Sequence, residues 1–138
     1  KYAGSTYKDI VALEIIIEAN GDTSDAFRTY AKHWGELKGF ALALQCGPEN
    51  LGETAVKLNR MMGLGPVLLN ASQVVGIDSN GNFIKDQAQD WNEFKLHMLK
   101  IQKLMVDEFG VVAKAKDQLG DMEALAGSMG SADSAEND

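Results

Sequence analysis

The stretch AKHWGELKGFALALQ, residues 31–45, indicates the fold more clearly than any other part of the chain. At about 100° per residue, its apolar side chains line one face of a helix between a Thr-Ser cap and a Gly-Pro break. The sequence predicts this helix from after the capping residues Thr23 and Ser24 to about Gln45. Its stripe consists of Phe27, Tyr30, Trp34, Leu37, Ala41 and Leu44, widened by Phe40. His33 falls inside the apolar arc and Glu36 at its edge, where a ligand or a buried polar pair would lie.

Three further helices are predicted around this one, because no apolar stretch alternates with period two for long enough to make a sheet. They cover residues 6–19, capped by Ser5 or Thr6, residues 50–62, ended by Gly63, and residues 84–109, with a continuation past Gly110 left open. A short helical piece is expected at residues 67–74, followed by a loop. We therefore expect an all-α bundle of about four main helices over residues 1–126 and a disordered acidic tail over residues 127–138.

Charge and cysteine content narrow the classes of function. The net charge of −7 argues against a nucleic-acid surface, because phosphate binding needs clustered lysines and arginines. Cys46 is the single cysteine, so no intrachain disulfide can form. No apolar run approaches the roughly 20 residues of a membrane span. A start at Lys1, without an initiator methionine or signal-peptide pattern, suggests a processed form, an excised fragment or a trimmed chain.

Acidic and imidazole groups lie near the apolar faces of three predicted helices. Spacings of three or four residues put two ligands on one side of a helix, as in metal-binding bundles. The pairs with this spacing are His33 with Glu36, Glu14 with Glu18, and Glu93 with His97. They predict a transition-metal site at His33 and Glu36, such as one for zinc, with the other four residues as candidate completing ligands. Alternatively, Glu14 and Glu18 pair with Lys38, and the acids near Glu93 are solvated at a helix N-terminus.

The loop GIDSNGNFI resembles a degenerate calcium-binding loop, because Asp78, Asn80 and Asn82 occupy alternate positions. Its glycine is Gly81 rather than the residue directly after Asn82, and Gln89 stands where the bidentate glutamate would be expected. The same residues are also typical of an Asn-Gly turn between two helical segments. The sequence leaves both interpretations open.

Residues 31–45, with a His-Trp pair leading to Lys-Gly and a FALALQ run, resemble a segment of bacterial imelysin-like proteins of the DUF4856 type. YKDIVALEIIIEA before it, GLGPVL after it and a long helix ending in EFG extend the resemblance over residues 6–110. The family has a G-x-H-x-x-E motif suspected of binding metal. His33 and Glu36 match its last two positions, whereas Ala31 stands in place of the glycine.

The resemblance implies a helical bundle of the bacterial periplasm, outer membrane surface or extracellular space, often a lipoprotein and linked to iron. Family members are longer, with two bundles, so this chain would represent about the C-terminal half. Self-association or a partner chain would then supply the missing half.

Three classes of function stay open. The first, favoured because the glycine is absent, is a non-catalytic structural or interaction module. The second is an iron or divalent-metal-binding protein that uses His33 and Glu36. The third is a metallopeptidase. The sequence disfavours it because it lacks an H-E-x-x-H helix, which would supply both the metal ligands and the general base.

Overall fold

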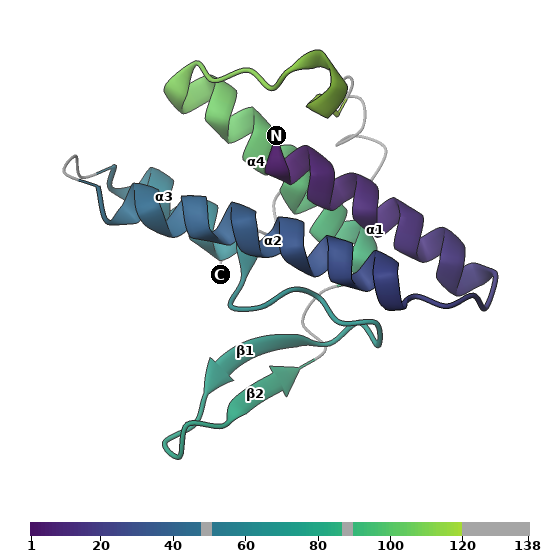
Figure 1. The fold of residues 1–138 in the computed structure, drawn as a ribbon. Helices are drawn as coiled ribbons and strands as arrows, with labels where there is room; N and C mark the ends of the chain where they lie inside the picture. Colours follow the sequence, from purple (N-terminus) through teal and green to yellow (C-terminus); the bar gives the residue numbers. More distant parts are fainter. Residues whose placement is uncertain (48–50, 87–89, 120–138) are drawn as a thin grey trace.

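The chain is predominantly helical, in agreement with the predicted all-α bundle. The computed structural model describes residues 1–47, 51–86 and 90–119. Four helices pack together (Figure 1): α1 (Tyr2–Glu18), α2 (Ser24–Gln45), α3 (Glu53–Met62) and α4 (Trp91–Phe109). α1 lies against both α2 and α4, and α3 closes the remaining side against the same two helices. The predicted tail over residues 127–138, and its boundary at residue 126, lie outside the described residues.

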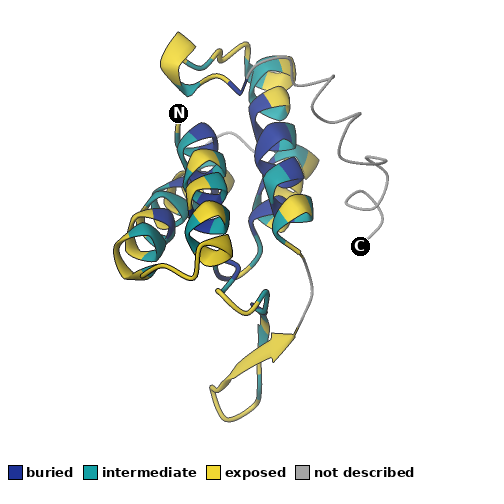
Figure 2. Cartoon of the chain, turned by 90° about the vertical axis from the view of Figure 1, so that its right-hand side faces the viewer, coloured by how far each residue is buried: buried dark blue, intermediate teal, exposed yellow. Residues whose placement is uncertain are grey.

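The core lies between the four helices, where Figure 2 shows their buried faces turned toward one another. Every helix contributes large side chains to it, as the apolar stripes predict. These side chains are Ile10 and Leu13 of α1, Tyr30 and Leu37 of α2, Leu58 and Met62 of α3, and Phe94, Met98 and Ile101 of α4. Phe40, predicted to widen the stripe of α2, is instead 58% exposed.

The helix ends test the predicted caps. α2 has the predicted end and begins at Ser24, one residue before the predicted start. α3 ends at Met62 as predicted, with Gly63 in the left-handed region at φ 72°, but it begins at Glu53 rather than at residue 50. α1 begins at Tyr2, so Ser5 and Thr6 lie inside the helix and the predicted cap there is wrong. Its apolar face continues through Ala3, and a buried face stabilises a helix turn without a side-chain cap.

A β-hairpin replaces two of the predicted helical segments. Strands β1 (Gln73–Ile77) and β2 (Phe83–Asp86) pair antiparallel, with a register shift between Val74 and Gly76. The predicted helical piece at residues 67–74 and the predicted helix start at residue 84 are therefore wrong. Each strand is too short to display a period-two pattern, although β-branched residues and the central Asn-Gly turn are typical of a hairpin. Figure 1 shows the hairpin projecting from the bundle.

α4 begins later than predicted and ends at the predicted residue. It begins at Trp91, where the side chain of Asp90 accepts a hydrogen bond of 2.7 Å from the backbone N–H of Glu93. It ends at Phe109, because Gly110 adopts a left-handed conformation at φ 61° that terminates the helix. The continuation past Gly110, which the sequence left open, does not form over residues 111–119.

Residues 111–119, called the strap below, run back across the N-terminal part of α1 (Figure 1) and include the short 3-10 helix η1 (Ala115–Asp117). Gln102 of α4 fixes the strap: its Nε2 donates to the Asp117 carbonyl (2.7 Å), and its Oε1 accepts from the Leu119 N–H (3.3 Å). Gly4 allows the close approach on the α1 side, because a Cβ there would overlap the Asp117 carbonyl oxygen. Among the described residues, no helix is long and apolar enough to cross a membrane.

Candidate functional site

His33 is held by a carboxylate from the neighbouring helix. Its Nδ1 donates to Oδ2 of Asp9 on α1 across 2.6 Å, and both side chains are partly buried. With Nδ1 engaged in this way, Nε2 is the ring nitrogen available to another partner, as in carboxylate–histidine–metal arrangements. Sequence reasoning missed Asp9, because spacing along one helix says nothing about a partner on another.

Glu36, the second predicted ligand, is half-buried one turn along α2 from His33. Within the described part of the chain, no hydrogen bond joins the two side chains. His33 and Glu36 are three residues apart and therefore lie on the same side of α2, as the spacing predicts. This shared side is the reason to consider them as two ligands of one site.

Glu14 is compensated by a cation, but not by the predicted one. Nζ of Lys95 on α4 lies 2.6 Å from Oε2 of Glu14, with both side chains largely buried. Lys38 instead donates to the Asn59 carbonyl at 3.2 Å, and partial burial lowers the pKa of Lys38. Glu18 is exposed at the end of α1. The predicted pairing of Glu14 and Glu18 with Lys38 is therefore wrong for the described contacts.

His97 is a core residue, 3% exposed. The pKa of His97 is lowered to about 4, chiefly by burial and also by the positive charge of Lys100, while a hydrogen bond with the Met61 backbone acts in the opposite direction. Its Nδ1 is buried without a hydrogen-bond partner among the described residues. Glu93, its predicted companion, lies half-buried in the first turn of α4.

The predicted ligands do not converge on one point. Among the residues that the structure describes, no three histidine, cysteine, aspartate or glutamate side chains are close enough to hold a metal ion together. His33 is closest to a ligand geometry, because Asp9 orients its ring.

The predicted calcium loop forms the tip of the hairpin, between two strands rather than two helical segments. Oδ1 of Asp78 accepts hydrogen bonds from the backbone N–H groups of Asn80 (2.8 Å) and Asn82 (2.9 Å), and Oδ2 accepts from the Asn82 side chain (3.1 Å). The bonds from Asn82 are the main cause of the lowered pKa of Asp78. The carboxylate thus organises the Asn-Gly turn, in which Gly81 has φ 85°.

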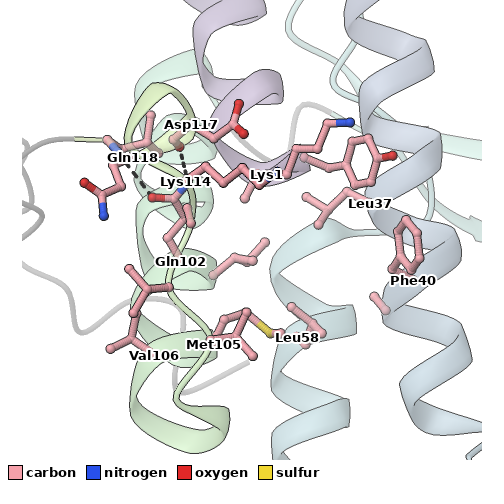
Figure 3. A pocket seen from close by; sticks show the side chains of 18 of the residues that line it. Lys1, Leu37, Phe40, Leu58, Gln102, Met105, Val106, Lys114, Asp117 and Gln118 are labelled. Carbon is pink, nitrogen blue, oxygen red and sulfur yellow. Dashed lines mark hydrogen bonds between the residues drawn. The ribbon is translucent and has the colours of Figure 1, made fainter.

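An open groove of about 750 Å³ lies at the end of the bundle where the strap crosses it, and we call it the end groove. Figure 3 shows side chains of α2, α4 and the strap turned into it. Its apolar walls include Leu37, Phe40, Leu58, Met105, Val106 and Val112. Sequence reasoning missed this site, because the groove exists only where the strap turns back after Gly110.

Comparisons of the chain with protein-family models, with curated proteins and with solved structures found no match. The hairpin, the Asp9–His33 pair and the end groove are therefore the candidate functional features of this chain.

Proposed function

We propose that this chain is a non-catalytic helical-bundle module that functions by self-association, in the periplasm or at a bacterial cell surface. The location is supported only by the resemblance of residues 6–110 to imelysin-like proteins. The observation that supports self-association is the exposed apolar surface of the hairpin. Ile77 is 61% exposed and Phe83 67% exposed.

Ile77 and Phe83 are partners across the two strands, so their side chains lie on the same face of the hairpin. Val75 and Ile84 are also exposed, and because Ile84 follows Phe83 directly in β2, it adds an apolar side chain to the opposite face of the hairpin. Figure 2 shows that this part of the chain projects from the bundle and is mostly solvent-exposed.

A second copy of the same chain fits this surface. The sheet has two strands, and a two-stranded hairpin is only marginally stable alone in water. Face-to-face packing of two hairpins in a symmetric dimer would bury Ile77 and Phe83.

Size-exclusion chromatography with light scattering tests this proposal. The parent protein should form a concentration-dependent dimer or larger assembly, and an Ile77→Ser/Phe83→Ser variant should be monomeric with unchanged helical circular dichroism. The matched control is Ile15→Ser/Val56→Ser, which removes exposed apolar side chains from α1 and α3 and should associate like the parent. A monomeric parent, or a hairpin variant that associates equally well, would contradict the proposal.

Divalent-metal binding through His33 and Glu36 is the second candidate function, and the Asp9–His33 hydrogen bond favours it. A carboxylate on the far ring nitrogen raises the basicity of a histidine ligand, and its removal typically costs about 10–100-fold in metal affinity. Elemental analysis after loading with iron(II) or zinc should find metal that a His33→Ala/Glu36→Ala variant does not hold. Asp9→Asn should weaken binding, whereas Asp25→Asn, an exposed residue of α2, should not. Equal metal in all four proteins would exclude this site.

A further inference from the structure

The end groove is polar at one end and apolar at the other. In Figure 3, Lys1, Lys114 and Gln118 gather at the upper end, whereas Leu58 and Met105 lie toward the lower end. Its volume of about 750 Å³ is within the range of roughly 300–1,000 Å³ that is typical of small-molecule sites. A ligand that matches this shape would itself be polar at one end and apolar along its length.

Positive charge dominates the polar end of the groove. Lys1, Lys114 and Lys116 belong to its lining, and Asp117 is the one carboxylate among the described lining residues. Lys8 of α1 adds a fourth cation next to them, because its Nζ donates to the Lys116 carbonyl. The whole chain has a net charge of −7, so this cluster is a local exception to an acidic surface.

The lysines of the strap have no carboxylate partner within the described part of the chain. Lys114 and Lys116 are exposed and take part in none of its ion pairs. The Nζ of Lys1 lies over the ring of Tyr2, 4.8 Å from its centroid. Among the described residues, no ion pair of Lys114 or Lys116 would have to break before either lysine contacts an anionic group.

We propose that the end groove binds a fatty acid, with the alkyl chain along the apolar walls and the carboxylate near Lys114 and Lys116. The strap supplies both parts of this site, because Val112 and the two lysines lie within one nine-residue segment. Gln102 and Gly4 keep that segment against α4 and α1, so the apolar wall and the cationic end are held together. This site is separate from the hairpin surface and does not depend on self-association.

Isothermal titration calorimetry of the full chain with sodium dodecanoate, below its micellar concentration, tests the proposal. Binding should saturate at one molecule per chain. Decanoate should bind roughly tenfold more weakly, because each of its two missing methylenes removes buried apolar surface. Dodecyltrimethylammonium, which has the same chain and the opposite charge, should bind more weakly than dodecanoate.

Two variants separate the contributions of charge and groove. Lys114→Gln/Lys116→Gln should weaken dodecanoate binding roughly fivefold, as expected for exposed ion pairs, and should reduce the preference over the cationic analogue. The matched control, Lys32→Gln/Lys57→Gln, removes two exposed lysines outside the groove and should bind like the parent. Val112→Asp, at a position 64% exposed, should weaken binding at least fivefold without unfolding the bundle.

The same titrations can overturn the proposal. Absence of saturable dodecanoate binding would do so, as would equal binding by the parent and Val112→Asp. If dodecanoate does not bind but Val112→Asp abolishes self-association, the groove holds a second copy of the chain instead. That result is distinguishable from failure of the hairpin proposal, because the Ile77→Ser/Phe83→Ser variant reports on the hairpin alone.

Discussion

Mild acid should destabilise this protein through His97, and His97→Gln should remove that effect. His97 is 3% exposed in the core, and its pKa falls from 6.5 to about 4, chiefly because burial disfavours the charged imidazolium. In the unfolded chain the ring binds a proton near pH 6.5, whereas in the folded chain it stays neutral until about pH 4. Between these two values the unfolded state holds more protons, so the free energy of unfolding decreases as the pH falls.

The magnitude follows from the difference between the two pKa values. Each pKa unit corresponds to about 1.4 kcal/mol, so a decrease from 6.5 to about 4 contributes about 3 kcal/mol of pH-dependent stability. This contribution is complete above pH 6.5 and is lost progressively down to about pH 4, below which the folded state also binds the proton. Glutamine is neutral throughout this range, and its amide can still donate to the Met61 backbone.

Urea unfolding followed by far-UV circular dichroism, from neutral pH to about pH 4, measures the effect. As the pH falls across this range, the unfolding free energy of the parent should decrease by about 3 kcal/mol relative to that of His97→Gln. His33→Gln serves as the control, because it removes the other histidine and should keep the acid sensitivity that arises from His97. A parent-to-variant difference that stays constant with pH would refute the assignment of a neutral, buried His97.

Two further substitutions test contacts between elements. Gly4→Ala should destabilise the protein by about 1–3 kcal/mol, because the added Cβ overlaps the Asp117 carbonyl. The control Gly39→Ala, with no atom within 4 Å of its Cβ, should be neutral or stabilising. Urea unfolding of both variants measures the difference, and equal effects would contradict the close approach of the strap to Gly4. A double-mutant cycle with Glu14→Gln and Lys95→Met should give a coupling energy on the order of 1 kcal/mol, since the pair is largely buried, and additive effects would mean that the two charges do not interact.

Local signals predicted the helices well wherever the relevant interaction lies within one segment. The apolar stripe from Phe27 to Leu44 predicts α2 to within one residue of its observed bounds, and Gly63 predicts the end of α3. Prediction failed for the segment between α3 and α4, because strands of four or five residues are too short to show a period. The predicted start of α4 was also wrong, because the acidic residues before Trp91 are compatible both with the first turn of a helix and with the segment that precedes it.

For the candidate sites, the sequence placed His33 and Glu36 on one side of α2 but could not name the partner of either. Asp9 reaches His33, and Lys95 reaches Glu14, across interfaces that depend on how the helices cross. The sequence around Asp78 fits both a calcium-binding loop and an Asn-Gly turn. The hydrogen bonds that its carboxylate accepts from backbone N–H groups become visible only in the folded hairpin.

The sequence by itself determined that this chain is a predominantly helical bundle, because helix periodicity, caps and breaks are local properties of a few consecutive residues. Tertiary structure alone decided which charges pair, how the hairpin projects with Ile77 and Phe83 exposed, and how the strap closes the end groove. These features join residues far apart in the chain. Their energies depend on distances and burial that are set only after the helices pack.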